Sequence, residues 1–230
     1  MVGHTDLIYA MGGELRVRAL IKAGANVNAT EDGNTALMHA SSMGHEPCAR
    51  ALIAAGANLN ATNKRGQTAL MIASQNGHAP CARALIEAGA NMNATTKNGS
   101  TALMFASQDG HEPCARALID AGANINATTK DYGFTLRTAL MIASENGHEP
   151  CARALIEAGA SINATAKDGY TALMDASQSG HEPCARALIE AGANINIMSA
   201  KDGKTALKLA SSGCHALCVR ALIQAGAKRD

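Results

Sequence analysis

The chain has 230 residues, with 20 lysines and arginines against 19 aspartates and glutamates, so its formal net charge is +1. This balance excludes the basic excess of a typical nucleic-acid-binding protein and also an acidic tail. No stretch approaches the roughly 18 consecutive apolar residues that a membrane-spanning helix needs, and we expect no signal peptide. Only five residues are aromatic, which indicates thin, closely packed helices rather than one large core.

A repeated triplet, Thr-Ala-Leu, divides the chain at regular steps. It begins at Thr35, Thr68, Thr101, Thr138, Thr171 and Thr205, so the steps are 33, 33, 37, 33 and 34 residues. A second series recurs in the same register: Cys48, Cys81, Cys114, Cys151, Cys184 and Cys218. Two independent series with one period and two short insertions indicate a repeat array.

Each repeat predicts two short helices. Thr35 is a good N-cap for a first helix over residues 36–43, and Gly44 is a natural end because glycine accepts a positive φ. Pro47 suits the first turn of a second helix, about residues 46–55. An Asn-rich loop and an Asp-Gly or Asn-Gly turn then lead to the next repeat. Helices of two or three turns are unstable alone, so neighbouring repeats must stack.

The pattern D-G-x-T-A-L-M-x-A-S-x-x-G-H-x-x-x-A-R-A-L-I-x-A-G-A-N-x-N resembles the ankyrin repeat, which has a 33-residue period and a T-P-L-H-x-A core. The resemblance covers essentially the whole chain. It implies an all-α solenoid of stacked helix-turn-helix units with β-turn fingers, binding other proteins through a concave face. Here T-P-L-H is replaced by T-A-L-M. Because Ala and Met are good helix formers, we expect the fold to survive this change.

We expect a single domain over residues 1–230. It consists of an N-terminal capping repeat, five internal repeats and a C-terminal capping repeat: 1–30, then 31–62, 63–95, 96–128, 129–165 and 166–199, then 200–230. Arg16 replaces the repeated cysteine in the first repeat, and Lys208 replaces methionine in the last. Polar replacements on outer faces are typical of the terminal repeats of a solenoid.

The repeated cysteines and histidines look chemical, but a structural role is predicted for both. Equivalent residues on stacked helices lie about 8–10 Å apart, too far for a disulfide, so we expect small buried hydrophobes in a reducing compartment, with no metal and no cofactor. A catalytic base would not be copied six times, so each histidine should instead hydrogen-bond a turn of a neighbouring repeat. Cys214 and Cys218 are the exception, for which a redox or metal-responsive role stays open.

Polar rows on the loops and second helices also have structural interpretations. The recurring Asn-Ala-Thr loops should be held by their own Asn and Thr side chains. The family resemblance also leaves hydroxylation of a loop asparagine open. The arginine of each second helix is followed four residues later by an acid in most repeats, which predicts a charge-balanced, solvated face. We find no nucleotide-binding loop, zinc-protease motif or nucleophile elbow, and we expect no enzyme.

Positions that vary between otherwise identical repeats are the candidates for function. They gather before the Thr-Ala-Leu triplet, inside the first helix, at its end and in the four-residue insertion. The candidate partner-binding residues, centred on the fourth to sixth repeats, are Gln75, Asn76, Phe105, Gln108, Asp109, Tyr132, Phe134, Arg137, Ile142, Glu145, Asn146, Tyr170, Asp175 and Gln178. Exposed Tyr and Phe beside Arg are typical of interface hot spots. The alternative is that Phe105 packs within the stack and the insertion is neutral.

These observations predict a cytoplasmic, non-catalytic protein–protein interaction scaffold that binds a partner protein through its concave face and turns. A permanent structural subunit of a larger complex is an alternative. A redox or metal-responsive protein acting through Cys214 and Cys218 is another. We expect no nucleic acid, membrane or small-molecule substrate as a partner.

Overall fold

The chain folds into two compact units. A computed structural model describes residues 6–10, 13–130 and 136–228. Unit 1 comprises Met1–Ala106 with Pro113–Ala123, and unit 2 comprises Ser107–Glu112 with Asn124–Asp230. The described residues are helical apart from loops and one short antiparallel pair, β1 (Thr30–Glu31) and β2 (Asn34–Thr35). None of the described helices is both long and apolar enough to cross a membrane.

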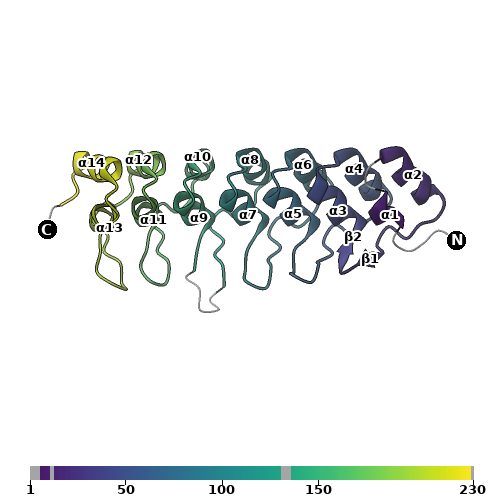
Figure 1. Cartoon of the computed structure of the whole chain (residues 1–230), viewed down its shortest axis with the longest axis horizontal. Helices are drawn as coiled ribbons and strands as arrows, with labels where there is room; N and C mark the ends of the chain where they lie inside the picture. Colours follow the sequence, from purple (N-terminus) through teal and green to yellow (C-terminus); the bar gives the residue numbers. More distant parts are fainter. Residues whose placement is uncertain (1–5, 11–12, 131–135, 229–230) are drawn as a thin grey trace. The chain divides into compact units, whose positions relative to one another are not determined.

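Unit 1 is built from helix pairs in two layers. Its helices are α1 (Asp6–Tyr9), α2 (Glu14–Lys22), α3 (Ala36–Met43), α4 (Glu46–Ala54), α5 (Ala69–Gln75), α6 (Ala79–Glu87), most of α7 (Ala102–Gln108) and most of α8 (Glu112–Asp120). The first helices α3 and α5 pack side by side, and so do the second helices α4 and α6 (Figure 1). We call the first helix of each repeat the inner helix and the second the outer helix.

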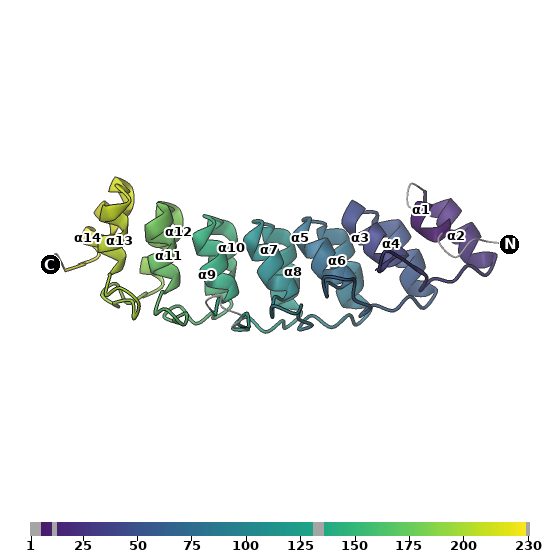
Figure 2. The same ribbon diagram turned by 60° about the horizontal axis from the view of Figure 1, so that its bottom comes forward.

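Unit 2 repeats this arrangement. Its complete helices are α9 (Ala139–Glu145), α10 (Glu149–Glu157), α11 (Ala172–Ser179), α12 (Glu182–Glu190), α13 (Ala206–Ser212) and α14 (Ala216–Gln224). The inner helix α11 packs between α9 and α13, and the outer helix α12 packs between α10 and α14. Figure 2 shows each inner helix beside the outer helix of its own repeat. The prediction of an all-α repeat fold is confirmed.

Local signals in the sequence explain the helix ends. The hydroxyl of Thr35 accepts a hydrogen bond from the backbone N–H of Met38 at 3.3 Å, and the same bond recurs at the other five Thr-Ala-Leu triplets. Helix α3 ends at Gly44, whose φ is 72°. A Cβ at position 44 would lie only 2.5 Å from Nδ1 of His78 in the next repeat, so close packing between the repeats also favours glycine at position 44. The outer helix α4 ends at Ala54, one residue earlier than predicted.

The core of each unit is narrow and made of small residues. Inner helices contribute Ala, Leu and Met, and outer helices contribute Cys, Ala and Leu. The six repeated cysteines are all buried, as predicted. Burial raises the pKa of the Cys81 and Cys114 thiols to about 11 and that of Cys184 to about 12, so these groups stay protonated and pack as small apolar side chains.

Histidine and asparagine side chains join neighbouring repeats through the backbone. Nε2 of His78 donates to the carbonyl of Ser42 at 3.0 Å, and equivalent bonds run from His148 to Gln108 and from His215 to Gln178. In the loops, Oδ1 of Asn60 accepts from the backbone N–H of Asn91 at 2.9 Å, a contact that recurs at Asn28, Asn126 and Asn163. The structural interpretation is confirmed for these residues.

Candidate functional site

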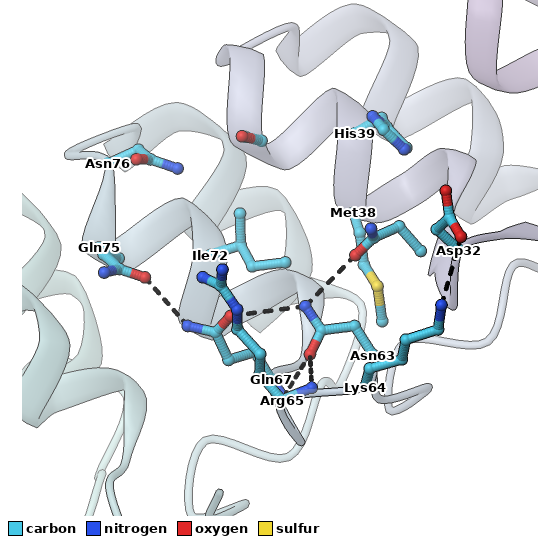
Figure 3. Close-up of a pocket in the computed structure, with 12 residues that line it drawn as sticks. Asp32, Met38, His39, Asn63, Lys64, Arg65, Gln67, Ile72, Gln75 and Asn76 are labelled. Atoms are coloured by element: carbon cyan, nitrogen blue, oxygen red, sulfur yellow. Dashed lines mark hydrogen bonds and ion pairs between the residues drawn. The ribbon is translucent and has the colours of Figure 1, made fainter.

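A groove crosses the inner face of unit 1. It has a cavity volume of about 570 Å³ and lies between α3 and α5 and the turns that precede them (Figure 3). The two helices contribute Met38, His39, Ser42, Ile72, Gln75 and Asn76. The two turns contribute Asp32, Asn34, Asn63, Lys64, Arg65 and Gln67. Two predicted residues, Gln75 and Asn76, therefore line this groove.

A chain of amide side chains runs along the groove. Oδ1 of Asn63 accepts the backbone N–H groups of Arg65 and Gln67, each at 3.0 Å. These two donors fix the orientation of the Asn63 amide, so its Nδ2 donates outward, to Asn34 Oδ1 at 3.3 Å and Gln67 Oε1 at 3.4 Å. Nε2 of Gln67 then donates to Gln75 Oε1 at 3.0 Å. Two backbone N–H groups of one turn thus determine which amide donates and which accepts throughout this chain of amide side chains.

Charged groups flank this amide chain. Nζ of Lys64 lies 3.2 Å from Oδ1 of Asp32, so the carboxylate of the groove is already paired. Arg65 also lines the groove, and its guanidinium has no ion pair or side-chain hydrogen bond among the described residues (Figure 3). Since Lys64 and Asp32 offset each other, Arg65 gives the groove a net positive charge.

Unit 2 uses the same two positions with ionic side chains. Arg137 and Glu145 stand where the third repeat has Gln67 and Gln75, and Nη2 of Arg137 lies 2.7 Å from Glu145 Oε2. Nη2 also lies 2.9 Å from Oδ2 of Asp175, on the inner helix of the next repeat. One guanidinium is therefore shared by two carboxylates. The contact between Gln67 and Gln75 in the third repeat thus has its equivalent in the contact between Arg137 and Glu145 in the fifth.

Asp175 occupies a position that is apolar in most other repeats. It is only 4 % exposed, on an inner helix where a partner-binding surface is predicted, so its carboxylate is a buried group rather than part of an exposed acidic surface. Burial raises its pKa to about 7 from 3.8. Arg137 opposes this rise, whereas the negative charges of Glu145 and Asp168 add to it.

The remaining predicted residues differ in accessibility. On the helices and turns of unit 2 the exposed residues are Gln108, Asp109, Glu145, Asn146 and Gln178. Four others are half-buried: Phe105 in unit 1, and Arg137, Ile142 and Tyr170 in unit 2. Tyr132 and Phe134 lie outside the described residues. Gln75 and Asn76 of the groove were predicted, but Asn63, which organises it, was missed. It lies in the loop before the variable positions, where the second and fourth repeats have Thr30 and Thr96.

The outer helices carry charges that are paired with one another. In most repeats the predicted partner of the arginine was the acid four residues later, whereas the ion pairs of Arg50 and Arg153 run to the acid four residues before and to the next repeat. Arg50 pairs with Glu46, four residues before it, and with Glu87 of the next repeat at 3.0 Å. Arg153 makes the same two contacts with Glu149 and Glu190. The cross-repeat pair forms because stacking brings equivalent outer helices side by side.

Cys214 and Cys218 differ sharply in their surroundings. Cys214 is exposed and has a φ of 57°, at the position where the five preceding repeats have glycine. Cys218 is fully buried in α14. Among the described residues, no group of three or more His, Cys, Asp or Glu side chains is arranged to hold a metal ion.

Comparisons with known proteins agree on one family. A family model described as ankyrin repeats (3 copies) matches residues 2–63, 52–129, 128–199 and 167–230. The crystal structure of human ASB11 ankyrin repeat domain is 28% identical, with a TM-score of 0.83, and the match covers 97% of this chain and 99% of that one. The ankyrin repeat domain of Bcl-3, described as a unique member of the IkappaB protein family, is 28% identical, with a TM-score of 0.81 and coverage of 96% and 99%. No curated protein sequence matches the chain.

Proposed function

Because this chain belongs to the ankyrin repeat family, whose repeats bind other proteins, we propose that it is a non-catalytic scaffold that binds a partner protein through its inner helices and turns. The observation that supports this proposal best is the groove of unit 1. Its polar groups come from positions that vary between repeats, such as Gln67 and Gln75. Stacking does not require these side chains, since other repeats do without them.

Polar side chains of the groove that lack partners support the same proposal. On the outer helices, Arg50 and Arg153 pair with glutamates of their own and the following repeat. On the inner side, Arg65 and Asn76 have no side-chain partner among the described residues. Polar groups without intramolecular partners retain their hydrogen-bonding capacity for a bound protein. Each inner helix also presents its own combination of side chains, which is the basis for selecting one partner over others.

Two arginine substitutions test the proposed face. Asn76→Arg adds a long charged side chain at the exposed end of α5, and Ala88→Arg adds the same side chain at the exposed end of the outer helix α6. The partner is first identified by affinity capture from native extract with mass spectrometry, and is then purified for calorimetric titration. We expect Asn76→Arg to weaken binding at least about tenfold, or 1.4 kcal/mol, and Ala88→Arg to leave it unchanged. The opposite pattern, or the absence of any stoichiometric partner, would overturn the proposal.

The proposed role is distinct from that of a permanent structural subunit. A scaffold that exchanges partners is expected to be soluble and monodisperse when expressed alone. An obligate subunit should aggregate or be recovered only with its companions. We also propose a cytoplasmic, reducing compartment, which is supported by the seven cysteines, one of them on the surface.

A further inference from the structure

The groove of unit 1 is rich in hydrogen-bond donors. The amide chain runs from Asn63 outward, so every amide oxygen in it accepts a bond: Asn34 Oδ1, Gln67 Oε1 and Gln75 Oε1. At its two ends, the N–H groups of Asn34 Nδ2 and Gln75 Nε2 have no acceptor among the described residues. An amide nitrogen can only donate, so both ends of the chain require acceptors.

The charged groups of the groove add to this preference. The Asp32 carboxylate, which would repel an anion, is paired with Lys64 at 3.2 Å. Arg65 is exposed, and its five N–H groups have no acceptor among the described residues. The two cations Lys64 and Arg65 and the one carboxylate leave the groove with a net charge of +1. Its electrostatic complement is an anion with several acceptor oxygens.

We infer that this groove binds an extended, acidic segment of a partner protein, with carboxylates at Arg65 and at the amide nitrogen of Gln75. This inference rests on the proposed function and specifies the chemistry of the partner. An extended chain suits the site because the hydrogen-bonded amides follow one another from Asn34 in one turn to Gln75 at the end of α5. Figure 3 shows Asn63, Gln67 and Gln75 along this row. Backbone carbonyls and acidic side chains of a strand-like segment present acceptors in such a row.

The lining disfavours two other kinds of partner. An amphipathic helix docks through apolar anchors, but Met38 is only 2 % exposed, so Ile72 is the one large aliphatic side chain partly open to the groove. Single-stranded nucleic acid binds through phosphate contacts and through bases stacked on aromatic rings. None of the twelve residues that line the groove is Phe, Tyr or Trp. The groove can pair with anions, but for stacking it offers bases only the imidazole of His39 and the guanidinium of Arg65, with no aromatic ring of the size of a base.

Two substitutions change the chemistry of the groove with little change in shape. Gln75→Glu replaces the terminal donor by a carboxylate that still accepts the hydrogen bond from Gln67. The fold accepts a carboxylate there, because the fifth repeat has Glu145 at the equivalent position. Arg65→Glu reverses the charge of an exposed turn residue. Arg83→Glu is the matched control, since it makes the same charge reversal on the exposed side of α6 in the same repeat.

The probe is a phage-displayed library of random peptides selected on the full chain. Selected sequences should be enriched in Asp and Glu, and a synthetic peptide from the selection should bind more weakly as salt rises. Gln75→Glu and Arg65→Glu should each weaken its binding at least about tenfold, with Arg83→Glu unchanged. Circular dichroism checks that all three variants remain folded.

Other results would overturn the inference while leaving the proposed function intact. The inference fails if the selected peptides are basic or apolar, or if an acidic peptide binds the wild type and the groove variants equally well. It also fails if no peptide is selected although Asn76→Arg weakens the binding of the captured protein partner. If poly(U) RNA binds more tightly than the selected peptides and loses affinity in the same two variants, the groove is a nucleic-acid site instead. If neither a peptide nor a protein partner binds the chain, the proposed function fails together with the inference.

Discussion

The buried carboxylate of Asp175 should make unit 2 less stable as the pH rises from 5 to 7. In the folded chain the pKa of Asp175 is raised by burial to about 7, whereas the unfolded chain has the ordinary value of 3.8. Between these values the folded state binds more protons than the unfolded state. The contribution of protonated Asp175 to the free energy of unfolding is therefore complete below pH 4 and is lost as the pH rises through 7. A shift of about three pKa units corresponds to about 4 kcal/mol in total, of which about 2 kcal/mol falls between pH 5 and pH 7.

The assay is urea unfolding of wild type and Asp175→Asn at pH 5, 6 and 7, followed by circular dichroism. The asparagine variant cannot titrate at this position, so the wild-type curve should fall relative to it by about 2 kcal/mol across this range. The readout is this change with pH, and any constant offset from altered contacts with Arg137 cancels. Asp109→Asn, on an exposed residue of the same unit, should follow the wild type. Parallel profiles for wild type and Asp175→Asn would refute the reasoning.

Three further predictions concern single positions. Gly44→Ala should lower the unfolding free energy by about 3 kcal/mol, because a Cβ would lie 2.5 Å from His78 Nδ1 and the backbone has a strained φ of 72°. Gly56→Ala is the control: its φ is 81° but nothing lies within 4 Å of the added Cβ, so it should cost only about 1–2 kcal/mol. Equal losses of the two variants in urea unfolding would contradict the close contact at Gly44. Cys214→Gly should raise the unfolding free energy by about 1 kcal/mol, since it relieves a φ of 57°; an unchanged or lower urea midpoint would count against this strain. A thiol reagent at pH 8 should modify Cys214 quickly and Cys184 only on unfolding, because burial raises the pKa of Cys184 to about 12; rapid modification of a second thiol in the native chain would be incompatible with the described core.

Features determined within one repeat could be predicted from the sequence. The threonine caps, the glycine at the end of α3 and the proline at the start of α4 each depend on neighbours a few residues away. The period of the repeat then predicts stacking, because helices this short cannot bury their apolar faces alone. The structural roles of the histidines and loop asparagines follow from the same logic, since a residue copied in every repeat serves what every repeat needs.

Which individual charged side chains of neighbouring repeats pair with one another could not be predicted. Arg137 and Asp175 are 38 residues apart, and the sequence shows two unrelated variable positions rather than an ion pair. The same holds for Arg50, whose partner Glu87 belongs to the next outer helix. The amide chain of the groove, which crosses from Asn63 to Asn34 of the preceding repeat, was missed because its direction depends on the Asn63 side chain binding two backbone N–H groups. The periodicity shows where variation lies, but only the stacked geometry shows which variable side chains meet.

Amide hydrogen exchange of the chain with and without its captured partner maps the surface that the partner covers. Helices are compared in pairs within unit 1, so that α4 and α6 serve as internal controls for α3 and α5. If the inner helices and turns of unit 1 bind the partner, exchange should slow on binding in α3, α5 and the turns around Asp32 and Asn63, with little change in α4 and α6. Protection confined to the outer helices would contradict it.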